Sequence, residues 1–263
     1  MDRRTPAGTA GPAIDIPLSI VIPAYNEERR IAQTLDTLRR DLDAQIGPSW
    51  EIIVCDDGSH DATTTVVDER VAADSRLRLI RNDGNRGKGA ALMAGFDAAR
   101  GDAVLFLDAD LPVPTSTVAE FVAAGRDADL VTGSRRVRGS IMTTPQPLLR
   151  RLGGRTFLWC VDRLGFGGNS DPQCGVKLLR RETLSPVVES VVLTRFAFDV
   201  ELINRCRSAG LRIVETPVTW THVEGSTLRP VRDAVATLAD LLRLRREFQP
   251  RAVATGEPTR IPS

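Results

Sequence analysis

The feature that most constrains this chain is an apolar run that ends abruptly in two carboxylates. Residues 103–107 are consecutively apolar and follow Gly101 and Asp102, a pattern that predicts a strand buried on both faces. Asp108 and Asp110 come directly after it, at the end of the strand where open α/β sheets bind ligands. Oxygen ligands of this kind suit Mg²⁺ or Mn²⁺, which in turn bind phosphate oxygens. The same pair also fits a turn or a helix cap, so both interpretations are open at this point.

Two more apolar strands end in polar loops that each open a helix. Residues 18–22 lead into Pro-Ala-Tyr-Asn-Glu at 23–27, and residues 50–55 lead into Asp-Asp-Gly-Ser at 56–59. A bland interpretation of 56–59 is a turn with a serine helix cap. One turn does not need two acids, however, and these acids are predicted at the same sheet edge as the later pair.

The remaining pattern completes an α/β fold. Strands are predicted near 18–23, 51–55, 77–81, 103–107 and 129–132, and helices near 27–43, 62–73, 88–99 and 115–125. This alternation predicts a Rossmann-like, mainly parallel sheet sandwiched by helices, with the ligand across the carboxyl ends of its strands.

Length and composition fit a single domain. A chain of 263 residues with 42% hydrophobic content can bury a full core, although it lies at the upper end of the range for one domain. We expect that domain over residues 17–248. Residues 1–16 and 249–263 carry Pro and Gly without an apolar pattern, so both are predicted to be disordered tails.

Charge and cysteine usage limit the partners and the compartment. A net charge of +1 favours no nucleic-acid partner. No stretch approaches the roughly 18 apolar residues of a membrane span, so we expect a soluble or peripheral protein. The four cysteines lack paired spacing, which indicates reduced thiols in the cytoplasm rather than disulfides or a metal site.

Lysine is almost absent from this chain. Of 35 basic residues only Lys88 and Lys177 are lysines, a usage typical of a bacterial genome rich in G and C. Each is therefore a candidate for a compact charge that arginine does not replace. Lys88 follows Gly87 in a turn that leads into a helix, where backbone amides and the ammonium can approach phosphates. Survival on the surface by chance is the alternative for both lysines.

The three motifs in this order resemble the nucleotide-sugar half of an inverting family 2 glycosyltransferase with the GT-A fold, and the resemblance spans roughly residues 18–246. It implies that Asp108 and Asp110 hold the donor through Mg²⁺ or Mn²⁺, and that Asp56 or Asp57 accepts a hydrogen bond from the base. The full set of donor-binding residues that it implies is Pro23, Ala24, Tyr25, Glu27, Asp56, Asp57, Gly87, Lys88, Asp108, Ala109 and Asp110.

The second half resembles the polyprenyl-phosphate branch of that family, closest to dolichyl-phosphate β-glucosyltransferases and next to dolichyl-phosphate mannosyltransferases. The segments that carry this resemblance are 133–135, 171–177, 195–202 and 220–226. It implies transfer of a hexose, glucose from UDP-glucose before mannose from GDP-mannose, to a polyprenyl phosphate. The residues implied to bind the acceptor phosphate are Arg135, Arg151, Arg155, Ser226 and Arg229. Arginine suits this role because its planar fork meets phosphate oxygens bidentately.

Two positions depart from the family pattern. Thr227 stands where relatives often have lysine, which shifts the expected clamp to Arg229. Pro112 stands where mannosyl relatives can have a polar metal contact, which weakens the mannosyl interpretation.

The implied reaction is one displacement at the anomeric carbon. The attacking phosphate is already ionised near neutral pH, so no strong general base is needed. The implied catalytic residues are Asp108 and Asp110, with Asp171 and Asp199 as acids that steady the sugar hydroxyls or the reacting carbon. Asp199 can instead cap the helix that it opens.

Membrane contact is expected from two helices, over residues 231–248 and 148–164, whose apolar residues gather on one side. Both helices can instead pack on their own domain. We expect a cytoplasmic location at the cytoplasmic membrane, with a membrane-protein partner also open. Three other functions are weighed: a family 2 enzyme with a soluble acceptor, a sugar-phosphate nucleotidyltransferase, and a non-catalytic binding subunit.

Overall fold

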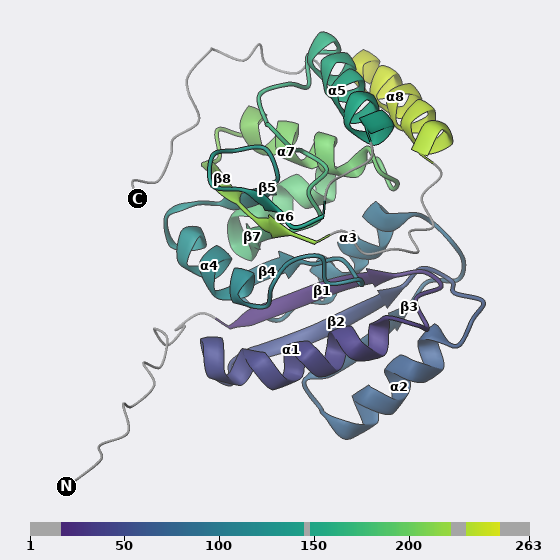
Figure 1. The fold of residues 1–263 in the computed structure, drawn as a ribbon, viewed down its shortest axis with the longest axis vertical. Coiled ribbons are helices and arrows are strands. Elements are labelled where there is room, and N and C mark those ends of the chain that lie inside the picture. The colour runs from purple at the N-terminus through teal and green to yellow at the C-terminus, as the bar shows by residue number, and fades with distance from the viewer. Residues whose placement is uncertain (1–16, 145–147, 222–229, 248–263) are drawn as a thin grey trace, which may run out of the picture.

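A computed structural model describes residues 17–144, 148–221 and 230–247 of the chain (Figure 1). The predicted tails 1–16 and 249–263, together with Ser226, Thr227 and Arg229, lie outside the described residues. The centre of the fold is a seven-stranded sheet of order β3-β2-β1-β4-β7-β5-β8. Its strands are β1 (Leu18–Ala24), β2 (Trp50–Asp56), β3 (Leu77–Arg81), β4 (Ala103–Phe106), β5 (Leu130–Ser134), β7 (Lys177–Arg180) and β8 (Ile213–Pro217).

Helices cover both faces of this sheet, because successive strand residues point to opposite sides. Ile20 and Ile22 of β1 pack in one cluster and Val21 packs in the other. The first face carries α1 (Ile31–Ile46), α2 (Thr63–Ala73) and α4 (Ser116–Ala124). The second carries α3 (Lys88–Ala98), α6 (Arg181–Ser190) and α7 (Phe198–Ser208).

Two helices form a layer of their own beyond α7. α5 (Leu148–Arg163) and α8 (Pro230–Glu247) pack side by side, at the top of Figure 1. Phe157, Val161, Leu241 and Leu244 are buried between them and the start of α7. A two-stranded parallel sheet of β6 (Ile141–Met142) and β9 (Thr219–Trp220) and a short 3₁₀ helix, Gly125–Asp127, complete the described elements.

The structure confirms the fold class, all five predicted strands and all four predicted central helices. The largest boundary difference is in α1, which begins at Ile31 rather than near residue 27 and ends at Ile46 rather than near residue 43. The segment before it forms a bend and a turn that are fastened to the second motif and to the start of α2, because the amide of Asn26 donates to Ser59 Oγ and that of Glu27 donates to Thr63 Oγ1. Asn26 itself has a φ of 57°.

One strand that the pattern left out matters for the site. β7 runs antiparallel between β4 and β5, so it enters the sheet at the edge where β4 and β5 end. Phe106 pairs with Lys177, the first residue of β7. The loop before β7 therefore lies at the carboxyl ends of the parallel strands.

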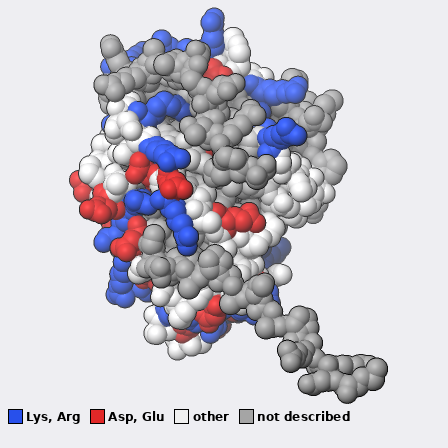
Figure 2. Space-filling view, turned by 90° about the vertical axis from the view of Figure 1, so that its left-hand side faces the viewer, with Lys and Arg blue, Asp and Glu red and all other residues white. Residues whose placement is uncertain are grey.

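The surface carries charges of both signs, and most of the cysteine thiols are buried. Acidic and basic side chains are interleaved on the face shown in Figure 2 rather than gathered by sign. Cys55, Cys174 and Cys206 are buried, and burial raises the pKa of the Cys55 thiol to about 12. None of the described helices is long and apolar enough to cross a bilayer.

Candidate functional site

Strand register brings the predicted motifs to one edge of the sheet. Ala24 at the end of β1 pairs with Asp56 at the end of β2, and Val21 pairs with Phe106 at the end of β4. The loop after each strand therefore opens on the same side. The polar motifs at 23–27, 56–59 and 108–110 meet there, although the first and the last lie more than 80 positions apart in the sequence.

The two acids of the second motif organise the loops around them. Asp56 accepts hydrogen bonds from the amides of Gly58 and Ser59. Asp57 accepts from the amides of Arg86, at 2.9 Å, and Gly87, at 2.7 Å. Both acids are buried, so their first visible role is to shape the loops of the site. A contact of either acid with a base stays a prediction.

Lys88 and Asp108 form an ion pair at the start of α3. The ammonium Nζ lies 2.6 Å from Asp108 Oδ1, and each side chain is about one fifth to one quarter exposed. Burial alone would raise the pKa of the Asp108 carboxyl, but Lys88 holds that pKa below its usual range. Burial alone would lower the pKa of Lys88, but the negative charges of Asp108, Asp199 and Asp110 raise it.

The other oxygen of Asp108 is pressed against backbone. A Cβ placed on Gly175 would lie only 1.9 Å from Asp108 Oδ2. This close approach requires glycine, because any side chain would displace the carboxylate. The loop before β7 thus fixes one edge of Asp108 while Lys88 takes the other.

Asp110 and Glu27 complete an acidic group. Burial, with a further contribution from Asp108, raises the pKa of the Asp110 carboxyl. Burial also raises the pKa of Glu27, whose carboxylate pairs with Arg30 at 2.6 Å. Carboxyls with raised pKa values favour a cation beside them, because added positive charge stabilises their ionised forms.

The acid pair fits a divalent ion that shares its ligands with a phosphate. Among the described residues, no group of three or more His, Cys, Asp or Glu converges on one point. Asp108 and Asp110 would supply two hard oxygen ligands, a number that fits Mg²⁺ bound by one or two carboxylates together with substrate phosphates and water.

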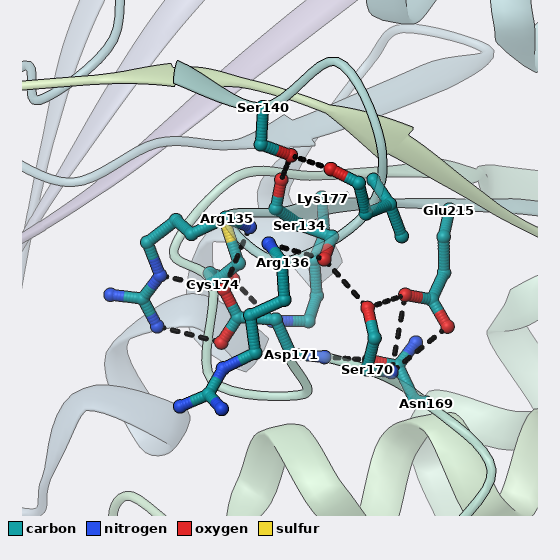
Figure 3. A network of polar contacts seen from close by, with 11 residues as sticks. Ser134, Arg135, Arg136, Ser140, Asn169, Ser170, Asp171, Cys174, Lys177 and Glu215 are labelled. Atoms are coloured by element: carbon teal, nitrogen blue, oxygen red, sulfur yellow. Dashed lines mark hydrogen bonds and ion pairs between the residues drawn. The ribbon is translucent and has the colours of Figure 1, made fainter. Parts of the chain in front are cut away.

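Arg135, directly after β5, is clamped by Asp171. Its Nε lies 2.6 Å from Asp171 Oδ2 and its Nη2 lies 2.7 Å from Oδ1 (Figure 3). The guanidinium also lies over the Trp220 ring, 4.8 Å from its centroid. Asp171 therefore occupies the edge of the guanidinium formed by Nε and Nη2, and a contact of Arg135 with an acceptor phosphate stays a prediction.

A network that the sequence did not indicate supports this pair. Ser134 Oγ and Ser170 Oγ share a 2.6 Å hydrogen bond, and the amide of Ser170 donates to both oxygens of Glu215 on β8 (Figure 3). The Ser170 hydroxyl also donates to Glu215. Isolated Ser and Glu residues form no motif, so only the packing of β8 beside β5 could show that they position Asp171.

Lys177 and Asp199 form a second, fully buried ion pair. Lys177 Nζ donates to Asp199 Oδ1 and to the carbonyl oxygen of Cys174, both at 2.6 Å. The two side chains are 1% and 6% exposed. The alternative in which Asp199 caps α7 is wrong, because Ala197 is the N-cap residue and makes no side-chain cap bond. Asp199 instead fastens the start of α7 to the loop before β7.

Glu201 holds the segment 192–194, which contacts the start of α3. Its carboxylate, completely buried, accepts from the amides of Val192 and Leu193. The carbonyl oxygen of Thr194, the next residue, accepts from the amide of Ala90 in the first turn of α3. This segment therefore helps to hold α3, the helix that begins at Lys88.

The remaining predicted residues are less informative. Pro23, Tyr25 and Glu27 are half-buried at the edge, while Ala24, Gly87 and Ala109 are buried. Arg155 is exposed on α5 and Arg151 belongs to the same helix. Arg136 was missed; it is exposed beside Arg135, and a Cβ on Gly154 of α5 would lie 3.1 Å from its Nη2.

Comparisons with known proteins identify the family. Residues 19–184 match the model of glycosyl transferase family 2. The chain is 32% identical over 252 residues to a dolichyl-phosphate β-glucosyltransferase of Dictyostelium discoideum, covering 89% of this chain and 75% of that protein. The human enzyme of the same name is 32% identical over 244 residues, with 88% and 75% covered.

Solved structures share the fold. Glucosyl-3-phosphoglycerate synthase of Mycobacterium tuberculosis, in complex with UDP, superimposes with a TM-score of 0.64 at 24% identity, covering 91% of this chain and 86% of that one. A mannosyltransferase of Pyrobaculum calidifontis, bound to GDP-mannose and Mn²⁺, gives a TM-score of 0.61 at 21% identity, with 89% and 67% covered.

Proposed function

Because the chain belongs to glycosyl transferase family 2, we propose that it transfers glucose from UDP-glucose to a polyprenyl phosphate, with inversion at the anomeric carbon. Relatives named dolichyl-phosphate β-glucosyltransferase cover most of the chain and support the sugar and the acceptor class. The observation that carries the proposal is that the acids of the donor motif and the arginine of the acceptor segment belong to one cluster. Gly175 packs against Asp108, and Asp171 in the same loop pairs with Arg135, whose charge also contributes to lowering the pKa of Asp108.

On the donor side, Asp108 and Asp110 are the residues that would hold Mg²⁺ or Mn²⁺. The bound ion supplies charge stabilisation for the departing diphosphate. The amides of Arg86 and Gly87, aligned by Asp57, lead into the N-terminus of α3, and Pro23, Tyr25 and Glu27 line the other side of the edge. Solved GT-A structures in complex with UDP or with GDP-mannose and Mn²⁺ share this fold.

On the acceptor side, Arg135 is the central residue of our proposal. Asp171 holds Nε and Nη2, so the third nitrogen, Nη1, is left to bind a phosphate oxygen. A guanidinium held by a carboxylate and an aromatic ring is preorganised, which reduces the entropy lost on binding. We propose Arg155, Arg151, Ser226 and Arg229 as further residues of this phosphate site.

The proposed reaction depends mainly on aligning the acceptor phosphate with the anomeric carbon of the donor. The acceptor phosphate oxygen forms a bond to the anomeric carbon while the bond from that carbon to the diphosphate oxygen breaks on the opposite face, and UDP carries away the electron pair. The nucleophile is already ionised, so no residue has to remove a proton. Arg135 aligns the nucleophile and Lys88 offers charge on the donor side, so catalysis rests on positioning and electrostatics.

We propose that the enzyme works on the cytoplasmic side of the cytoplasmic membrane, docked through the outer face of α5 and α8. Leu241 and Leu244 pack inward, whereas Trp159, Val235 and Leu242 are 61%, 63% and 51% exposed. The predicted apolar stripe of the last helix is therefore divided between core and surface. We define the outer face as Trp159, Val235, Leu242 and the exposed arginines Arg155, Arg163, Arg243 and Arg246.

This outer face suits a bilayer surface with anionic headgroups. Arginine and exposed Trp or Leu on one side of a helix layer combine electrostatic attraction with shallow apolar insertion. A polyprenyl phosphate presents its phosphate at the same surface, so docking would bring the acceptor to the enzyme.

The test is a transfer assay with purified protein. UDP-glucose carrying radiolabelled glucose is incubated with a short polyprenyl phosphate and Mg²⁺ or Mn²⁺, and the product is extracted into organic solvent. We expect label in the organic phase that depends on the acceptor and on the cation. Label from GDP-mannose but not from UDP-glucose would reverse the sugar assignment, and label only in a water-soluble product would overturn the acceptor class.

A further inference from the structure

Lys88 takes the position at Asp108 that a cation would need. Its Nζ lies 2.6 Å from Asp108 Oδ1. The backbone of Gly175 is packed so closely on Oδ2 that a Cβ there would approach to 1.9 Å. A cation that approaches Asp108 therefore meets an ammonium at one oxygen and backbone at the other.

Hydrogen bonds hold the backbone around Lys88, whereas its side chain ends in a long stem with rotatable bonds. Asp57 holds the amides of Arg86 and Gly87, and the amide of Ala90 donates to Thr194 O at 3.0 Å. The lysine stem carries a point charge on four rotatable carbons, and the side chain is 21% exposed. Nζ can leave Asp108 without any change of backbone.

We propose that Lys88 is the resident counter-ion of Asp108 in the free protein and exchanges its partner when donor binds, moving from the carboxylate to the diphosphate as the divalent ion enters. This inference rests on the proposed function. Two cations cannot share one carboxylate oxygen at close range without strong repulsion. The ion therefore binds weakly by itself and tightly together with a nucleoside diphosphate, which gives Lys88 a new partner.

If this exchange occurs, removing the Lys88 ammonium should raise the affinity for Mn²⁺ alone and lower the affinity for UDP in the presence of Mn²⁺. Without the ammonium, Asp108 is free, so the affinity for Mn²⁺ alone should rise about tenfold or more. The affinity for UDP in saturating Mn²⁺ should fall about tenfold, because the diphosphate loses a charged partner. A lysine with only a structural role would weaken both bindings or neither.

The experiment measures Mn²⁺ binding by titration calorimetry and by the loss of free-ion signal in electron paramagnetic resonance, with and without UDP. Wild type is compared with Lys88→Met, which keeps the stem, and with Lys88→Arg, which keeps the charge. We expect Lys88→Met to bind Mn²⁺ alone more tightly than the other two proteins. The melting temperature of Lys88→Met should fall without metal, because Asp108 loses its partner, and should rise more on adding Mn²⁺ than that of wild type.

Each outcome decides the inference. Equal or weaker binding of Mn²⁺ by Lys88→Met overturns the exchange, while the metal site and the proposed function stand if Mn²⁺ with UDP still binds. Failure of wild type to bind Mn²⁺ even with UDP overturns both. If Lys88→Met folds only in the presence of Mn²⁺, the ion has replaced the ammonium, and this result supports the exchange. If neither Lys88→Met nor Lys88→Gln folds in the presence of Mn²⁺, the exchange is overturned.

Discussion

Asp171 holds Arg135 by two parallel hydrogen bonds, of 2.6 Å to Nε and 2.7 Å to Nη2. The carboxylate is 4% exposed and the guanidinium 24%. Burial would raise the pKa of Asp171, but Arg135 holds it below its usual range. The pair links the end of β5 to the loop before β7, so a change in either residue alters both the acceptor side and the support of Asp108.

Arg135→Ala is expected to raise the KM for polyprenyl phosphate or lower kcat while UDP binding changes little. It should also destabilise the fold by about 3–5 kcal/mol, because Asp171 is left as a buried unpaired charge. The double variant Arg135→Ala, Asp171→Ala should recover part of this loss. Urea unfolding of the single and double variants measures the coupling, and additive losses would show that the pair is not coupled.

Asp110→Ala, and nearly as strongly Asp108→Ala, should reduce transfer by roughly 10²- to 10³-fold, the usual loss when a central electrostatic stabiliser is removed. Asp110→Ala should keep its melting temperature, because burial already opposes the charge on this carboxyl. Steady-state transfer rates and a melting curve make the test. Near-normal turnover by folded Asp110→Ala contradicts the metal site.

Gly175→Ala should reduce transfer on the order of 10²-fold and lower stability by about 1–3 kcal/mol. The reason is the new methyl group, which would overlap Asp108 Oδ2 and force the carboxylate away. The matched control is Gly153→Ala in α5, where a Cβ meets nothing within 4 Å. That variant should keep its activity and gain up to about 1 kcal/mol. Equal activity of the two variants would contradict the close approach.

The donor is expected to be UDP-glucose rather than GDP-mannose. Calorimetry with UDP and with GDP, each with Mg²⁺, should give tighter binding of UDP. The support is the match of the second half to glucosyl relatives and Pro112, which provides no polar side chain near Asp110. Tighter binding of GDP would reverse the assignment.

Trp159→Glu together with Leu242→Glu should weaken co-sedimentation with anionic liposomes and slow transfer to a lipid-embedded acceptor. The control is Ala72→Glu with Ala73→Glu, which adds the same two charges at exposed positions of α2, at the end of the molecule away from α5 and α8 in Figure 1. Both proteins should show native melting curves. Equal liposome binding by the two would remove the outer face of α5 and α8 as the docking surface.

The sequence by itself determined the fold class and the location of the site. The apolar runs at 18–22, 50–55 and 103–107, interrupted only by Ser19 and Glu51, predict buried strands, and their polar ends share an edge because parallel strands align. The motifs around Asp57, Lys88 and Asp108 could be recognised in the sequence because each consists of neighbouring residues in a loop between a strand and the next helix.

What only the tertiary structure decided is how these residues pair. Lys88 with Asp108, Arg135 with Asp171 and Lys177 with Asp199 are joined across 20, 36 and 22 residues. The last two pairs depend on the antiparallel strand β7 and the loop before it, which no periodic pattern predicted. Burial made each charge need a partner, and the partner was fixed by which loops the sheet order brought together. The sequence shows which charged residues are present, but only the packing of the loops decides which of them form pairs. In the low-dielectric interior the energy of an ion pair changes strongly over a few ångströms, so the pairing depends on the folded geometry.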